Sequence, residues 1–164
     1  MKVDVSRLAR MDGAYQDLAF EGFLEGQPND QGEVILDRPV RFQGRIGNAG
    51  GILKLDGILE TEYAVRCARC LEDLRIPLKA EVHESFAYAG NTDGGGPEDG
   101  AYYRRGDAVE LDKPLLDNIF LSFPQVWHCS PACRGLCPVC GTNLNQGMCR
   151  CSGDLGEESE ASGG

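Results

Sequence analysis

Apolar and polar residues alternate along most of the first 90 positions. A period of two is that of a β-strand with one buried face. Residues 15–24 show this period weakly, and four later runs show it clearly. The apolar members of those runs are Val40, Phe42 and Ile46; Leu53, Leu55 and Leu59; Tyr63, Val65 and Cys67; and Leu74, Ile76, Leu78, Ala80 and Val82. The pattern predicts a β meander whose strands are mainly antiparallel.

Three interruptions of this alternation have structural meaning. Residues 47–51 (Gly-Asn-Ala-Gly-Gly) predict a hairpin connection, because Gly and Asn tolerate the positive φ of a tight turn. Glu60 and Thr61 form a break between the second run and the third. Pro77 lies within the last run, and proline lacks the N–H that a strand ladder uses. We therefore expect an exposed edge or a bend at Pro77.

The period changes after an acidic, Gly-rich stretch at 90–100, which predicts a flexible loop. Asp112 can cap a helix, Pro114 suits its first turn, and Pro124 cannot continue it. We expect an amphipathic helix over 113–122 that packs on the sheet. Its apolar face consists of Leu115, Leu116, Ile119, Phe120 and Phe123.

The length of 164 residues predicts one domain with a small appended module. We expect a β-rich domain over 1–125, a cysteine-rich segment packed on it over 126–152, and a disordered acidic tail over 153–164. The chain has 16 Lys and Arg against 26 Asp and Glu, so its net charge is −10. This excludes a generally basic RNA-binding surface. The segment 126–152 has two arginines and no acidic residue, which leaves room for a local contact.

The beginning of the chain gives an expectation about its compartment. Met1–Arg7 contains charges where a signal peptide needs apolar residues. No apolar run approaches the ~18–20 residues of a membrane helix. We therefore expect a cytoplasmic protein, in which paired cysteines bind metal or carry out redox chemistry. In an exported protein the eight cysteines could instead form disulfides.

The spacing of the cysteines is the strongest chemical signal. They are Cys67, Cys70, Cys129, Cys133, Cys137, Cys140, Cys149 and Cys151. Two thiolates of a C-x2-C turn can face one Zn²⁺ and leave two tetrahedral positions for another pair. Eight thiolates suit two such sites, and the simplest partition groups the first four cysteines and the last four. A mixed partition and a single zinc with spare thiols stay open at this point.

Several neighbours of the cysteines bear on this metal hypothesis. Arg69, Arg134 and Arg150 could offset the net negative charge of a four-thiolate zinc site. His128 could replace a cysteine ligand, whereas His83 is typical of a partly exposed surface histidine. An iron–sulfur cluster also uses four thiolates, but a C-x2-C pair followed by glycine favours zinc.

The sequence offers little support for catalysis. Closed four-thiolate sites leave no open position for substrate or water. The chain lacks a Gly-rich phosphate loop, a nucleophile elbow and a carboxylate–His arrangement at catalytic spacing. We expect a non-enzymatic protein with one or two zinc ions. Its predicted fold class is α+β: a mainly antiparallel β meander with one amphipathic helix and a C-terminal cysteine-rich zinc-binding segment.

Residues 67–72 (Cys-Ala-Arg-Cys-Leu-Glu) form one cysteine signature. Residues 133–145 (Cys-Arg-Gly-Leu-Cys-Pro-Val-Cys-Gly-Thr-Asn-Leu-Asn) and 149–151 (Cys-Arg-Cys) form a second, and Leu-Ser-Phe-Pro stands between them at 121–124. These stretches resemble the C-x-R-C-L signature, the second cysteine signature and the L-x-L-P segment of the YceD family. That family is described as large ribosomal RNA subunit accumulation protein. The resemblance covers most of the chain, from the first strands to Cys151.

The resemblance implies a ribosome-biogenesis factor that supports accumulation or processing of large-subunit ribosomal RNA, through contact with that RNA or with ribosomal proteins. The acidic net charge favours contact through a basic ribosomal protein, and neither a membrane nor a small-molecule substrate is indicated. Direct RNA contact would use arginines and stacking aromatic rings, with Tyr63 as a further candidate ring. The main candidates are Arg41, Arg45, Arg66, Arg69, Arg75, Arg134, Arg150 and Trp127.

Two other hypotheses stay open on the sequence alone. One is a zinc-dependent interaction or regulatory module unrelated to ribosomes, whose acidic face would bind a basic partner. The other is a thiol redox or metal sensor, which requires exposed thiolates of low pKa. A redox role of the thioredoxin type is disfavoured, because the first C-x2-C pair lies in a strand meander rather than a βαβ unit.

Overall fold

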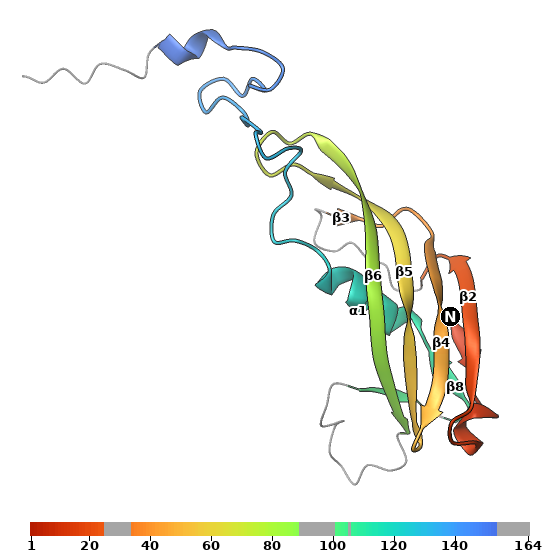
Figure 1. The fold of residues 1–164 in the computed structure, drawn as a ribbon. Helices are drawn as coiled ribbons and strands as arrows, with labels where there is room; N and C mark the ends of the chain where they lie inside the picture. Colours follow the sequence, from red (N-terminus) through yellow and green to blue (C-terminus); the bar gives the residue numbers. More distant parts are fainter. Residues whose placement is uncertain (25–33, 89–100, 105, 154–164) are drawn as a thin grey trace, which may run out of the picture. The chain divides into compact units, whose positions relative to one another are not determined.

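The structure of the chain is a computed structural model (Figure 1). It describes residues 1–24, 34–88, 101–104 and 106–153. The predicted acidic loop at 90–100 and the predicted tail beyond residue 153 lie outside these ranges. The strands are β1 Lys2–Asp4, β2 Tyr15–Gly22, β3 Val34–Ile35, β4 Val40–Ala49, β5 Ile52–Arg66, β6 Asp73–Tyr88, β7 Tyr102–Arg104 and β8 Ala108–Glu110. The helices are the α-helix α1 Asp112–Leu121 and the short 3-10 helices η1 Leu8–Arg10 and η3 Arg150–Gly153.

The chain divides into two compact units. Unit 1 comprises residues 1–64 and 75–124, and unit 2 comprises residues 65–74 and 125–164. The division near residue 125 lies close to the start expected for the cysteine-rich segment. The stretch 65–74, expected within the β-rich domain, belongs instead with the cysteine-rich segment. The reason is that its two cysteines lie among the cysteines of that segment.

The sheets explain the fold class. One six-stranded sheet has the order β2-β4-β5-β6-β7, with β3 beside β5, and a two-stranded sheet pairs β1 with β8. The β2–β4 and β4–β5 pairs are antiparallel, while β6 and β7 pair in parallel over three residues. The structure therefore confirms an α+β fold with a mainly antiparallel sheet. The short strands β1, β3, β7 and β8 carry no alternation long enough to predict them.

The longer predicted runs are all strands. Gly50 and Gly51 form the turn between β4 and β5 with φ of 64° and 89°, as the hairpin prediction requires. The break expected at Glu60 and Thr61 is wrong, because β5 runs through both residues and buries the same face on either side. Pro77 lies in β6, whose pairing with β7 covers only its last three residues. In the described residues Pro77 thus has no partner strand on that side, as expected of an exposed edge.

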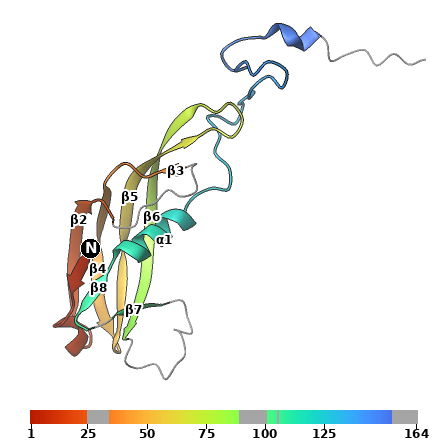
Figure 2. The same ribbon diagram turned by 180° about the vertical axis from the view of Figure 1, so that it is seen from behind.

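The helix α1 lies on one face of the sheet, in front of it in the view of Figure 2. It buries Leu115, Leu116 and Ile119, whereas Phe120 is partly exposed. The expected cap is wrong: the capping residue is Leu111, and Asp112 is the first helical residue. Asp112 instead pairs with the N-terminal amine. Among the described helices, none has the length and apolar character needed to cross a membrane.

The two faces of the sheet differ in chemistry because the alternation sends apolar side chains to one side. The face toward α1 is buried, and its fully buried side chains include Phe42, Ile46, Leu53, Leu55, Leu59, Val82 and Phe86. The opposite face carries ion pairs between neighbouring strands. They include Arg41–Glu21 at 2.9 Å, Arg45–Asp17 at 2.7 Å and Lys79–Glu60 at 2.9 Å. Each exposed pair contributes little to the stability of the fold, because solvent screens the charges.

A pair of facing glycines lies in the middle of the sheet. Gly44 of β4 is opposite Gly57 of β5, and the ring of Phe42 covers both. A Cβ added to Gly57 would lie 2.6 Å from the Gln43 carbonyl oxygen and 2.6 Å from the Phe42 ring. Side chains at these positions would push the strands apart or displace the ring, so glycine is required for close packing.

We expect Gly57→Ala to lower the free energy of unfolding by about 1–3 kcal/mol, because the added methyl group overpacks this site. Gly22→Ala in β2 is the matched control, since a Cβ there has nothing within 4 Å. Thermal or denaturant unfolding followed by circular dichroism measures both variants. Equal stabilities of Gly57→Ala and Gly22→Ala would contradict the packing argument.

Candidate metal centres

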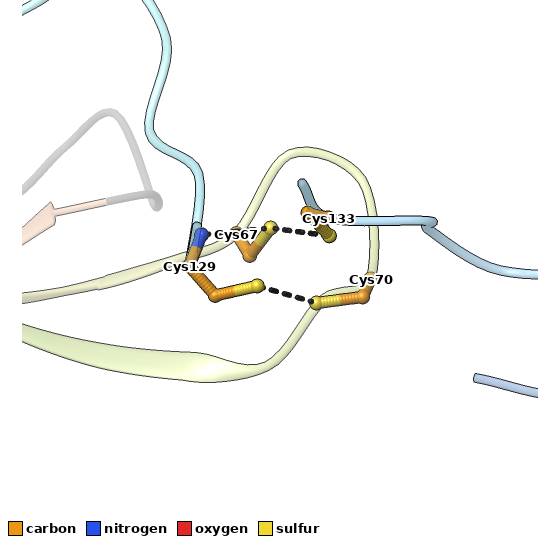
Figure 3. Close-up of side chains that lie close together, drawn as sticks. All are labelled: Cys67, Cys70, Cys129 and Cys133. Carbon is orange, nitrogen blue, oxygen red and sulfur yellow. Dashed lines mark hydrogen bonds between the residues drawn. The ribbon is translucent and has the colours of Figure 1, made fainter. Parts of the chain in front are cut away.

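The first cysteine cluster consists of side chains from two segments far apart in the sequence. The β5–β6 connection and the chain beyond α1 supply Cys67, Cys70, Cys129 and Cys133 (Figure 3). The Sγ atoms of Cys67 and Cys133 are 3.8 Å apart, and those of Cys70 and Cys129 are 3.6 Å apart. All four sulfurs lie within 4.8 Å of one another. Three of the four residues are buried, and Leu74 and Leu136 pack against them.

The second cluster is local in sequence and more exposed. It consists of Cys137, Cys140, Cys149 and Cys151, again with all sulfurs within 4.8 Å of one another. Only Cys137 is buried, and Cys140 is exposed. All eight cysteines are free thiols, grouped as the partition by sequence order predicts. His128 belongs to neither group, and His83 is an exposed residue bonded to Asp56 at 2.8 Å.

The two C-x2-C turns share one backbone geometry. In each, the residue after the second cysteine donates its N–H to the carbonyl of the first cysteine at 2.9 Å, from Leu71 to Cys67 and from Gly141 to Cys137. The N–H of each first cysteine in turn donates to the carbonyl two residues beyond the second cysteine, at 2.9 and 2.8 Å. Both turns therefore hold their paired sulfurs on the same side, as a shared metal ion requires.

Hydrogen bonds stabilise negative charge on particular sulfurs of the first cluster. Burial opposes ionisation of Cys67, but backbone N–H groups, including that of Cys129 at 3.4 Å, lower its pKa to about 6. Burial likewise opposes ionisation of Cys133, and the Asn145 amide, 3.4 Å from its sulfur, lowers its pKa. In contrast, the neighbouring Cys133 sulfur and burial raise the pKa of Cys129 to about 12. Ionisation is therefore favoured at Cys67 and Cys133 and opposed at Cys129.

The second cluster shows the same contrast between its cysteines. The Thr142 hydroxyl, 3.1 Å from the sulfur of Cys140, and the Thr142 backbone lower the pKa of Cys140 to about 6. The Cys140 sulfur and burial raise the pKa of Cys151 to about 12. A bound divalent cation would displace the thiol protons in both clusters, because metal ligation requires thiolates.

Asn145 is a functional candidate that the sequence argument missed. The chain folds back through a bridge between Leu136 and Asn143, which encloses the second C-x2-C turn. Beyond this bridge, the Asn145 side chain accepts a hydrogen bond from the Arg134 N–H at 2.8 Å and donates to the Cys133 sulfur. The turn of the second cluster therefore positions a hydrogen-bond donor for the first. Spacing could not reveal this, because the contact depends on the fold of the hairpin.

The comparisons with known proteins bear on the family of the chain. A family model described as large ribosomal RNA subunit accumulation protein YceD matches residues 55–161. The chain belongs to the YceD family. Uncharacterized proteins of Mycobacterium tuberculosis and Mycobacterium bovis are each 34% identical to it over 152 residues, which cover 88% of this chain and 70% of the relative.

A more distant relative carries the family name. It is a maize protein named large ribosomal RNA subunit accumulation protein YCED homolog 1, chloroplastic. It is 26% identical over 142 residues, which cover 69% of this chain and 48% of the maize protein. No solved structure gives a significant match.

The structure places the candidate contact residues of this YceD-family chain in two settings. Four arginines form ion pairs: Arg41 with Glu21, Arg45 with Asp17, Arg66 with Asp73, and Arg75 with Asp37 and Glu62. The other four candidates, like Arg66, are in unit 2.

Those four residues, Arg69, Trp127, Arg134 and Arg150, differ in their roles. Arg69 donates to the Cys133 carbonyl at 3.1 Å, so it ties the two segments of the first cluster together. The backbone carbonyl oxygen of Trp127 accepts a hydrogen bond from the Ala68 N–H at 2.9 Å. Arg134 and Arg150 are exposed and form no ion pair within the described residues. Tyr63, offered for stacking, is buried with its ring 4.6 Å from that of Phe123, so it cannot receive a base.

We expect Asn145→Ala to lower the metal affinity of the first cluster about 10–100-fold, because the variant lacks the amide donor to the Cys133 sulfur. The measurement is chelator competition on the Co²⁺-loaded protein, followed by its thiolate-to-cobalt absorption. Gln146→Ala is the control, since among the described residues Gln146 forms a hydrogen bond through its backbone N–H and not through its side chain. Identical release curves for both variants would rule out a role for the amide.

Proposed function

We propose that this protein is a non-enzymatic cytoplasmic factor that supports the accumulation of large-subunit ribosomal RNA. The observation that carries the proposal is the YceD family match over residues 55–161, whose description names that role. The name of the maize relative supports it. The matched region includes all eight cysteines and the helix α1.

In both clusters the four sulfurs lie within 4.8 Å of one another, which supports structural zinc sites. A tetrahedral zinc ion with Zn–S bonds of about 2.3 Å holds its sulfurs about 3.8 Å apart. The 3.8 and 3.6 Å separations in the first cluster agree with that edge. A multinuclear iron–sulfur cluster divides its four thiolates among several irons and so spreads them more widely. We therefore propose one zinc ion per cluster.

This coordination also supports a non-catalytic role. Four thiolates complete a tetrahedral shell and leave no position for water or substrate, unlike the three-ligand sites of zinc enzymes. The chemistry that such zinc supplies is structural: it offsets thiolate charge and holds distant segments together. In the first cluster, Arg69 and Asn145 support this arrangement through the Cys133 carbonyl and sulfur.

The charge distribution favours a protein of the large subunit over its RNA as the direct contact. The arginines of the sheet that could meet phosphates already face carboxylates, and RNA binding would bring phosphate close to those same carboxylates. Exposed ion pairs are weak, so their arginines could exchange a carboxylate for a phosphate. The obstacle to RNA binding is therefore the repulsion between the carboxylates and the phosphates, rather than the ion pairs themselves. Only two described arginines of unit 2, Arg134 and Arg150, are exposed without an acidic partner or a backbone carbonyl bond.

The deciding experiment is depletion of the protein followed by profiling of ribosomal RNA and particles. We expect large-subunit ribosomal RNA to fall relative to small-subunit RNA, with accumulation of large-subunit precursors. Unchanged precursors and particle ratios would contradict the proposal. In that case, affinity purification without ribosomal proteins would favour an unrelated interaction module, and rapid thiol oxidation in the metal-loaded protein would favour a sensor.

We expect Cys140→Ser to lower the zinc content from two ions per chain to one and to destabilise the second cluster by several kcal/mol. The reason is that metal binding at a four-thiolate site is coupled to local folding. Elemental analysis and a thermal melt measure both effects. The control is Ser130→Ala, which changes a side chain outside both clusters. Full zinc content and an unchanged melt in Cys140→Ser would contradict the assignment.

A further inference from the structure

The two C-x2-C turns differ at one strained backbone position. The residue after the second cysteine has a positive φ in both turns, 72° at Gly141 and 60° at Leu71. Glycine adopts this left-handed conformation without penalty, whereas a Cβ clashes with the neighbouring carbonyl. Leu71 is the only non-glycine residue with positive φ in the described part of the chain. The first turn thus carries a conformational cost that the second turn avoids.

Packing against the described residues does not offset this cost. The Leu71 side chain is 58% exposed. The neighbouring Leu74 and Leu136 pack against the first cluster, so apolar burial beside these cysteines is possible without Leu71. The backbone hydrogen bond of Leu71 to Cys67 is reproduced by glycine in the second turn. A leucine side chain at this position is therefore not explained by the fold.

We propose that Leu71 is a docking residue that inserts into an apolar pocket on a basic protein of the large ribosomal subunit. Residues held in strained backbone conformations concentrate at functional sites. This proposal rests on the proposed function and names the contact surface through which it acts. The surface consists of Leu71 and the two acidic residues that follow it, Glu72 and Asp73.

The charge beside Leu71 favours a protein partner over RNA. Glu72 and Asp73 are both exposed. Asp73 pairs with Arg66 at 3.1 Å, while Glu72 forms no ion pair within the described residues. The Glu72 carboxylate contacts the Cys70 sulfur at 3.9 Å but has no basic partner among the described residues. Its charge therefore repels phosphates and complements a pocket with Lys and Arg at its rim. An apolar side chain also contributes most in a pocket that excludes water, as protein interfaces provide.

The test uses the full metal-loaded chain and large-subunit precursor particles isolated from cells depleted of the protein. Co-sedimentation measures binding of the wild type, Leu71→Gly, Leu71→Met and Glu72→Gln. We expect Leu71→Gly to bind about tenfold more weakly or worse, and Leu71→Met to bind within about twofold of the wild type. Glu72→Gln should bind more weakly at low salt and show a smaller salt dependence. Val139→Ala, which shortens an exposed apolar side chain in the second turn, is the matched control.

A thermal melt separates docking from a role in the fold. We expect Leu71→Gly to melt at the wild-type temperature or above it, because glycine relieves the strain at this position. A clearly lower melting temperature would show that Leu71 supports the fold and would overturn the proposal. Equal particle binding by the wild type and Leu71→Gly would also overturn it and leave the proposed function intact.

Two further outcomes identify the partner. The first uses large-subunit ribosomal RNA stripped of protein. If the wild type binds this RNA, and Leu71→Gly weakens that binding as much as it weakens particle binding, the contact is with RNA and the assignment of a protein pocket is overturned. A wild-type chain that binds no particles, together with unchanged ribosomal RNA after depletion, would overturn the proposed function and this inference with it.

Discussion

The convergence of four sulfurs in the first cluster is the constraint on which the organisation of unit 2 depends. It brings the turn between β5 and β6 to the chain that follows α1, although 58 residues separate Cys70 from Cys129. The sulfurs of Cys70 and Cys129, 3.6 Å apart, would repel each other as uncompensated thiolates. A bound cation removes that repulsion. On the proposed metal sites, coordination chemistry rather than a large apolar core would join these segments.

The two clusters are connected by a hairpin of the backbone and by one side-chain hydrogen bond. The hairpin that carries the second C-x2-C turn ends at Asn145, whose amide reaches the Cys133 sulfur. Gly135 allows the close approach on which this depends, since its φ is 74° and an added Cβ would lie 3.2 Å from the Arg69 carbonyl oxygen. Residues between the cysteines thus have specific roles. Metal occupancy of one cluster is expected to influence the other through this hairpin.

Much of the sheet follows from local pattern. Residues that alternate between apolar and polar form β4, β5 and β6 because one apolar face must be buried. A shift of the strand by one residue would turn that face to solvent. The break expected at Glu60 does not occur, since pairing along the strand and the burial of Leu59 and Tyr63 outweigh the local polarity. The helix cap was misjudged because capping depends on the path by which the chain enters the helix. A short acidic side chain alone does not specify that path.

The sequence by itself determined the fold class, the approximate helix, the grouping of the cysteines and the family, since these depend on local periodicity, spacing and motif. Tertiary structure decided which arginines face carboxylates, because cross-strand partners such as Glu21 and Arg41 are 20 residues apart. It also decided that Tyr63 is buried and that Asn145 contacts a sulfur. The left-handed backbone at Leu71 belongs with these features. It is imposed by the closure of the cysteine turn, and leucine itself does not favour it.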